Sequence, residues 1–191
     1  YLVPSVSDVL LHGAEQIELF DAPLLELREY SIRWEERVIK RAADLILALI
    51  GLVLASPILM FKLLKNLLTE QKSGIVSIQS TGKDGTIFKA YSFEEKSFGY
   101  RIPLLFNVIR GSMSMVGPER MSEKQYHDLI EKNDQFFYRT RVKPGLTGYA
   151  GLHSGAETPQ EEVLKMDLYY VQHFSLLLDI KILLQSLRVR L

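Results

Sequence analysis

The uncharged run LILALIGLVLASPILMF, at residues 45–61, constrains this chain more than any other feature. A straight helix over this run would rise about 26 Å, slightly less than the ~30 Å hydrocarbon core of a bilayer. Within it, Pro57 removes a backbone donor and clashes with the preceding turn, while the Ser56 hydroxyl is placed to bond a freed carbonyl. Cations flank both ends, so the charge pattern marks neither end as the cytoplasmic one.

These features predict a re-entrant membrane helix over residues 41–66 that enters one leaflet, bends at Ser56 and Pro57, and returns to the same face. Two alternatives stay open: a buried core helix of a soluble protein, and a kinked helix that does cross the membrane. The first alternative requires protein on all sides, because the run is apolar all round.

Composition narrows the possible functions. The 191 residues carry a formal net charge of zero, so no overall basic field indicates a nucleic-acid partner. The absence of cysteine excludes disulfides, thiolate metal sites and cysteine nucleophiles. The four histidines lack metal-ligand spacing and are interpreted as surface or packing residues.

The chain divides into an N-terminal arm and an α+β domain. Residues 1–37 are interpreted as the tail of a preceding α/β unit with a charged connector, or as a simple arm. Residues 38–191 are expected to form a small mixed helix and strand domain after the membrane helix, with interfacial amphipathic helices. The expected elements are a hairpin turning at residues 82–85 and helices at 102–111, 122–141, 158–174 and 175–191.

Two loops carry cations in patterns that suit an anion. In MSMVGPERM, the Gly-Pro turn offers backbone N–H groups beside Arg120, although an ordinary turn explains the pattern too. In YRTRVKPGLTGYAGL, Arg139, Arg141 and Lys143 alternate, so they project from one side if the segment is extended. Such a cationic face suits a diphosphate, and an edge strand guarded by cations is the equal alternative.

One adjacent pair of carboxylates, Glu94 and Glu95, is the candidate catalytic group. Adjacent strand residues point to opposite faces, so at most one of them aims at a site unless the backbone turns there. A solvated loop explains the pair equally well.

Five segments, in this order along residues 38–191, resemble the bacterial sugar transferase family, the monotopic polyprenyl-phosphate phosphoglycosyl transferases: IKRAADLILALIGLVLASPILM, IQSTGKDGTIFKAYSF, IPLLFNVIRGSMSMVGPER, RVKPGLTGYAGL and DLYYVQHFSLLLDIKILLQSL. The resemblance implies transfer of a sugar-1-phosphate from a nucleotide diphosphate sugar to undecaprenyl phosphate, with Mg²⁺. The product of such a reaction starts an O-antigen, capsule, exopolysaccharide or glycoprotein glycan. Residues 1–37 resemble the end of the Rossmann-like domain that precedes the catalytic domain in large members.

The resemblance also implies a site and partners. In the family the apolar helix is re-entrant and breaks at a Ser-Pro pair, which corresponds to Ser56 and Pro57. The implied location is the cytoplasmic face of the bacterial inner membrane, with its lipid surface as a partner, no nucleic acid, and a homo-oligomer as an open possibility. The residues expected to face a diphosphate or a lipid phosphate are Arg120, Arg139, Arg141, Lys143, Gly145 and Thr147.

The departures from the family pattern concern catalysis. The family's Asp-Glu pair, its nucleophile and metal-holding group, is replaced here by Tyr100 and Arg101, so the Mg²⁺ ligands are not identifiable. The family's Gly-Pro-Arg-Pro reads Gly-Pro-Glu-Arg, with Glu119 in the place of arginine. The segment between Phe93 and Pro103 is also shorter than in typical members, by some tens of residues.

Two hypotheses follow. The chain is an active transferase whose carboxylates come from Glu94 and Glu95 or from a segment missing from this sequence. Alternatively, it is a non-catalytic membrane-surface homologue that binds a nucleotide sugar, a lipid phosphate or an active partner. The departures predict little or no turnover; if the chain does turn over, Glu94 or Glu95 should be essential.

Overall fold

The computed structural model describes residues 14–19, 22–27, 34–68, 75–93, 99–155 and 157–190. Within this part of the chain the fold is mixed and rich in helix, as the sequence predicted at this coarse level. The strands form three two-stranded sheets: the antiparallel pairs β1 (Ala14–Leu19) with β2 (Ala22–Leu27) and β3 (Val76–Thr81) with β4 (Ile87–Ser92), and the parallel pair β5 (Ser114–Val116) with β6 (Gly145–Thr147). The helices are α2 (Trp34–Leu68), α3 (Leu104–Arg110), α4 (Glu123–Lys132), α5 (Tyr149–His153), α6 (Gln160–Gln172) and α7 (Leu176–Arg190), with 3₁₀ turns η1 (Lys83–Gly85) and η2 (Asp134–Arg141).

Local sequence signals explain several of these boundaries. Ser122 caps α4 through a capping box with Gln125, as expected for a serine before a helical pattern. Gly111, at φ 90°, ends α3 in the left-handed conformation that glycine adopts at low cost. The single helix predicted over residues 122–141 is wrong, because Asn133 leaves the helical conformation and its side chain caps η2.

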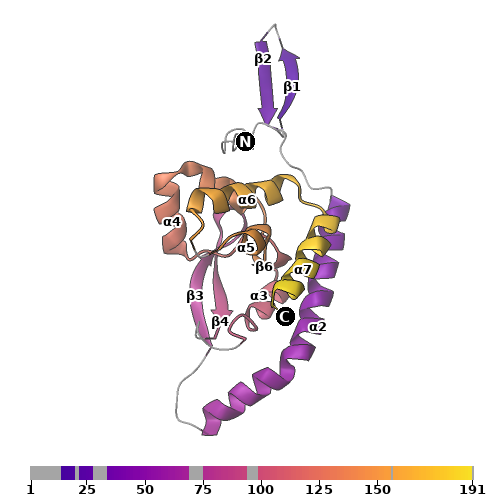
Figure 1. Cartoon of the computed structure of the whole chain (residues 1–191), viewed down its shortest axis with the longest axis vertical. Helices are drawn as coiled ribbons and strands as arrows, with labels where there is room; N and C mark the ends of the chain where they lie inside the picture. The colour runs from indigo at the N-terminus through magenta and orange to yellow at the C-terminus, as the bar shows by residue number, and fades with distance from the viewer. Residues whose placement is uncertain are drawn as a thin grey trace.

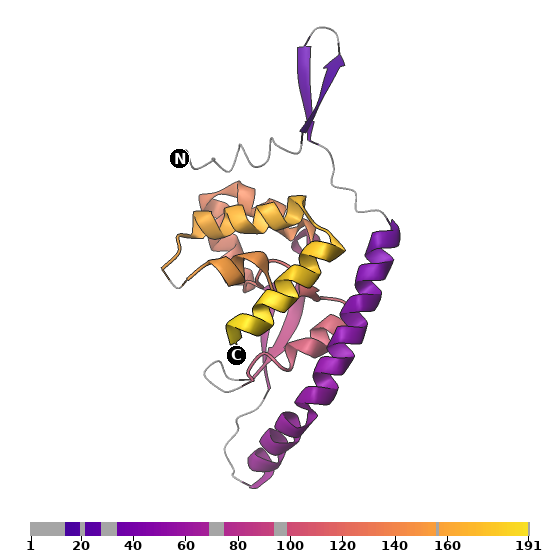
Figure 2. The ribbon, with the colours of Figure 1, turned by 45° about the vertical axis from the view of Figure 1, so that its right-hand side comes forward.

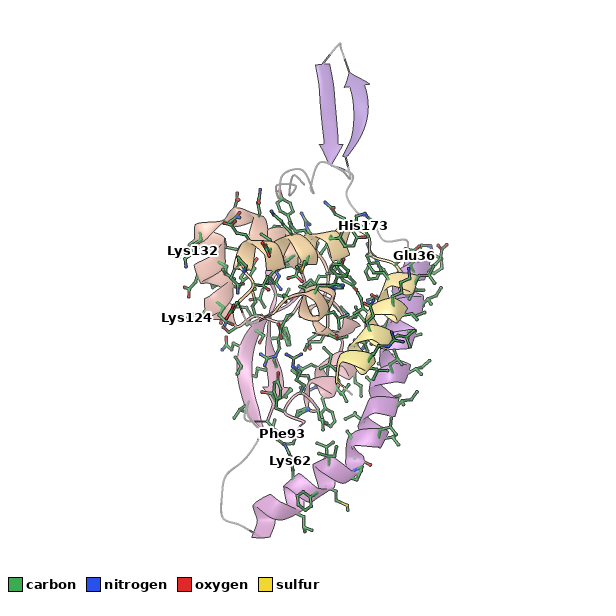
Figure 3. The ribbon with its side chains drawn as sticks, viewed as in Figure 1. Glu36, Lys62, Phe93, Lys124, Lys132 and His173 are labelled. Carbon is green, nitrogen blue, oxygen red and sulfur yellow. The ribbon has the colours of Figure 1, made fainter. Side chains whose placement is uncertain are left out.

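The long helix α2 lies along one side of the domain (Figures 1 and 2). It is one continuous helix rather than the broken one predicted over residues 41–66, and it extends beyond that range at both ends. Pro57 lies inside it, and the Ser56 hydroxyl donates to the Val53 carbonyl at 2.7 Å. The ribbon changes direction on the N-terminal side of the labelled Lys62 (Figure 3), so α2 is bent without a break in the helix. A bend at Ser56 and Pro57 themselves stays a prediction.

Polar contacts join the N-terminal half of α2 to the rest of the fold. Lys40 Nζ lies 2.5 Å from Asp179 Oδ2 on α7. The Arg41 guanidinium donates to the carbonyls of Val108 and Ile109, at 2.6 and 2.7 Å, and so satisfies two carbonyl groups at the end of α3. These contacts fix one face of α2 against the domain.

Three clusters of buried side chains form the core of the described residues. The first joins α2 to α3 and β4, the second joins β5 to α6 and α7, and the third joins η2 to α6. Their largest fully buried members are Met113, Leu164, Leu168, Tyr170 and Ile182.

The opposite face of α2 is apolar and uncovered. Ile46, Leu49, Val53 and Leu54 are each at least half exposed. Only 17% of the most apolar window of this helix is buried, which argues against a buried core helix. Helix α7 adds a second apolar stripe, because Leu177, Ile180, Leu184 and Leu187 recur every three or four residues and are all exposed.

Candidate functional site

A cavity of about 550 Å³ opens in the domain, a volume within the range of small-molecule binding sites. Its wall comes from the residues before and at the start of α3, the loop after β5, helix α4, η2, β6 and the segment leading into α6. The side chains with ionisable groups in this wall are Tyr100, Arg101, Glu119, Arg120, Asp128 and Arg139.

Close backbone packing positions the loop after β5. The Gly117 N–H donates to the Thr147 carbonyl at 3.0 Å, and the Gly145 N–H donates to the Pro118 carbonyl at 2.9 Å. A Cβ on Gly145 would lie 2.2 Å from the Gly117 nitrogen, so only glycine permits this approach. The packed loop presents Glu119 and Arg120 to the cavity.

A buried ion pair supports the same loop from behind. Arg139 and Asp167 are 4% and 1% exposed, with Nη2 2.7 Å from Oδ2. Arg139 Nη2 also donates to the Glu119 carbonyl at 2.9 Å. The Asp167 oxygens accept no hydrogen bond from the described residues, so the pair is a charge contact without aligned N–H bonds. Burial raises the pKa of Asp167 to about 6, against the opposing charge of Arg139.

A second ion pair crosses the cavity wall in an exposed position. Arg101 Nη2 lies 2.7 Å from Glu119 Oε1, and the two side chains are 31% and 58% exposed. Arg101 and Glu119 are two of the positions at which the resemblance implies other residues, an acid and an arginine respectively. The structure shows that their side chains meet.

Arg120 is the cation in the cavity wall without such a partner. Its side chain is partly buried, and within the described residues it takes part in no hydrogen bond, ion pair or ring contact. It therefore has all its donors free for an anion.

The structure brings together only some of the predicted phosphate-binding residues. Arg120, Arg139 and Gly145 line the cavity, whereas Arg141, Lys143 and Thr147 do not. The shared face was expected only for an extended segment, and that condition is not met, because Arg139 and Arg141 lie in η2, whose period is near three rather than two. Their side chains accordingly do not share a face.

The other members of that predicted set have different surroundings. Arg141 is exposed, with its guanidinium 5.3 Å from the centre of the Phe137 ring. Lys143 lies by Gly111 at the end of α3, and burial, followed by the charge of Arg41, lowers its pKa. Thr147 pairs with Val116 between β6 and β5. A role of these three residues in phosphate binding stays a prediction.

Sequence reasoning missed Asp167 as part of the site. The sequence does carry a signal for it, which is one carboxylate on an otherwise largely apolar helix face. The buried face of α6 is formed by Leu164, Asp167, Leu168, Tyr170 and Val171. A lone acid at such a position requires a buried cation, which η2 supplies.

The described residues do not fit the Mg²⁺ that the resemblance implies. Mg²⁺ takes oxygen ligands, and the carboxylates of the wall are Glu119, already paired with Arg101, and Asp128. No group of three or more acidic or histidine side chains able to hold a metal occurs in the described part of the chain. Glu94 and Glu95 fall outside the described residues. The described residues on either side of that segment are joined, since the Phe93 N–H donates to the Tyr100 carbonyl at 3.0 Å.

Comparison with known proteins matches residues 100–191 to the family described as bacterial sugar transferase. A UDP-glucose:undecaprenyl-phosphate glucose-1-phosphate transferase of Xanthomonas campestris pv. campestris is 31% identical, covering 98% of this chain and 46% of the relative. An Escherichia coli (strain K12) protein of the same description is 27% identical, covering 95% of this chain and 46% of the relative. A UDP-N-acetylgalactosamine-undecaprenyl-phosphate N-acetylgalactosaminephosphotransferase of Aeromonas hydrophila is also 27% identical, over 78% of this chain and 43% of the relative.

The chain belongs to the bacterial sugar transferase family. It spans about half the length of the curated relatives it matches. The alignment with the Xanthomonas protein runs over 229 positions, more than the 191 residues of this chain, so that relative has residues without a counterpart here.

Proposed function

We propose that this protein transfers a sugar-1-phosphate from a nucleotide diphosphate sugar to undecaprenyl phosphate, as the first step of a surface glycan, and that the 550 Å³ cavity holds the nucleotide sugar. The observation that carries the proposal is the cavity wall, which combines Arg101, Arg120 and Arg139 in a family whose named relatives use such substrates. Guanidinium groups match the geometry of phosphoryl oxygens.

The placement of α2 supports a position at a membrane surface. Both ends of its apolar run contact the same domain: Lys40 pairs with Asp179, and Lys62 Nζ lies 4.1 Å from the centre of the Phe93 ring (Figure 3). If α2 crossed a bilayer, this domain would have to lie inside the hydrocarbon together with its polar side chains, at a high free-energy cost. A re-entrant or surface-lying helix avoids that cost, which supports our proposal that the cavity lies at a membrane surface, the cytoplasmic face of the bacterial inner membrane.

Pro57→Ala should straighten α2 and move it toward a membrane-crossing orientation, because the missing backbone hydrogen bond returns. Single cysteines at Arg37 and Lys65, labelled with an impermeant maleimide in sealed vesicles, report the side on which each end lies. Both ends should label from one side in the unsubstituted protein, and some of the Pro57→Ala protein should lose labelling at one end. Labelling from opposite sides before substitution would exclude the re-entrant helix.

Glu94 and Glu95 are the proposed source of the carboxylate nucleophile, since covalent transfer requires a group that attacks the β-phosphate. If either one serves, Glu94→Gln or Glu95→Gln should lower UMP release from the UDP-sugar donor by roughly a hundredfold or more. Glu161→Gln, an exposed change in the first turn of α6, is the matched control. UMP release that persists in both glutamine variants would exclude both residues.

A second candidate function rests on the residues at the cavity wall. Tyr100 and Arg101 stand where the family has its acidic pair, and Arg101 is engaged with Glu119. This arrangement favours a non-catalytic homologue that binds the nucleotide sugar. Binding of UDP-sugars without UMP release would distinguish it from the transferase.

A further inference from the structure

The Arg101–Glu119 ion pair lies at the cavity, and its two side chains can separate at low free-energy cost. Both residues line the cavity, and the Glu119 side chain is 58% exposed, so it has solvent into which to turn. Exposed ion pairs contribute little to stability, because water and salt screen them. An anion in the cavity therefore competes with Glu119 at small cost.

Arg101 itself is held in place without Glu119. Its Nε donates to the Tyr100 hydroxyl at 2.7 Å, and its Nη1 donates weakly to the Leu146 carbonyl at 3.4 Å. Both partners are uncharged, and both belong to the cavity wall. When Glu119 turns away, the guanidinium keeps its position and its Nη2 is left to face a new acceptor.

Two other guanidinium groups complete the charge pattern. Arg120 lines the same cavity and has no partner among the described residues. Arg139 is buried and already committed to Asp167 and the Glu119 carbonyl, so its charge is balanced and it offers the cavity no free donor. When Glu119 turns out of the cavity, only one of the two wall carboxylates remains there. The wall then suits anionic oxygens and does not suit a divalent cation.

We propose that Arg101 and Arg120 bind the diphosphate of a nucleotide directly, that Glu119 is an internal competitor which the diphosphate displaces, and that this binding needs no divalent cation. The proposal rests on the proposed function only in assigning the cavity to the nucleotide sugar. It depends on the two side chains that this chain has at positions 101 and 119, an arginine and a glutamate.

Titration calorimetry with UDP, in EDTA and with detergent-solubilised whole chain, tests it. Arg101→Gln should weaken UDP binding about tenfold or more, because a charge-assisted contact is lost. Glu119→Gln should tighten it several-fold, because the competing carboxylate is gone. Two control variants make the same changes in net charge away from the cavity, and their affinity for UDP should stay within about twofold of the unsubstituted chain. They are Arg110→Gln, at a residue whose guanidinium contacts Tyr91, and Asp84→Asn, at a residue whose carboxylate faces Lys83.

Three results would overturn the proposal. UDP binding that appears only with Mg²⁺ would assign the phosphates to a metal. Weakening by Glu119→Gln as large as by Arg101→Gln would make the pair a structural support rather than a competition. Binding of decyl phosphate but not of UDP would assign Arg101 to a lipid phosphate. No acceptor lipid is present in the assay, so UDP binding is measured separately from sugar transfer. A chain that transfers no sugar can therefore still support or contradict this inference. A chain that transfers sugar but binds UDP only with Mg²⁺ keeps the proposed function and loses this inference.

Discussion

Asp167→Ala should lower the free energy of unfolding by about 3–5 kcal/mol, the usual cost of removing one partner of a buried ion pair. The reason is that Arg139, only 4% exposed, keeps its charge and loses its counter-ion. The Glu119 carbonyl alone does not compensate a buried guanidinium. Urea denaturation followed by circular dichroism measures the loss.

The double variant Asp167→Leu with Arg139→Met is the control for this prediction. Replacing both charges by apolar side chains removes the uncompensated charge, so most of the lost stability should return. A double variant as unstable as Asp167→Ala would show that the destabilisation comes from packing and not from the buried charge.

Because the pKa of Asp167 is raised, the contribution of this residue to folding stability should depend on pH. Burial moves the pKa from its usual 3.8 to about 6, so between these values the folded chain holds a proton that the unfolded chain has released. Stability from this group is therefore present below about pH 4 and is lost as the pH rises through about 6. The stability advantage of the unsubstituted chain over Asp167→Asn should shrink across that window, and an advantage that grows would contradict the assignment.

Gly145→Ala should be the second strongly destabilising change, by about 3 kcal/mol or more. Its Cβ would lie 2.2 Å from the Gly117 nitrogen and 2.4 Å from the Thr147 carbonyl oxygen, and these backbone atoms are fixed by the β5–β6 pairing. The loop that carries Glu119 and Arg120 would then shift. Thermal unfolding and UDP titration should both report the change.

Gly151→Ala is the matched control for the glycine prediction. A Cβ there meets nothing within 4 Å, and the residue lies inside helix α5. Alanine in a helix is favoured over glycine by roughly 1 kcal/mol, so this variant should be neutral or slightly more stable. Equal destabilisation by both alanines would show that backbone entropy, and not the close approach, decides the effect.

Local sequence signals predicted the elements better than they predicted the site. Ser122, Gly111 and the residues around Asp84 mark ends and turns through interactions within a few residues, so their positions could be predicted. The uncharged run of α2 was visible for the same reason. The helix remains continuous past Pro57 because one lost hydrogen bond bends a long helix without ending it.

The cavity depends on contacts between distant residues, which periodicity does not reveal. A face shared by Arg139 and Arg141 required an extended segment, yet this segment is a 3₁₀ turn that Asn133 caps, and Arg139 pairs with Asp167. Likewise, nothing in the sequence indicated that Arg101 and Glu119 are neighbours in space. Only the fold shows that their side chains form an ion pair.

The most direct test of the whole account is whether sugar phosphate reaches the lipid. The whole chain, in vesicles containing undecaprenyl phosphate, is incubated with a panel of UDP-sugars labelled in the sugar, and label is measured in the lipid extract. The proposed transferase function predicts label in the lipid with at least one donor, whereas the departures at residues 100 and 101 taken alone predict little or none. Arg120→Ala should reduce the label about tenfold or more, and Arg110→Gln should leave it unchanged. Label absent from the lipid for every donor, while the protein still binds UDP, would contradict the transferase and leave the non-catalytic binding protein.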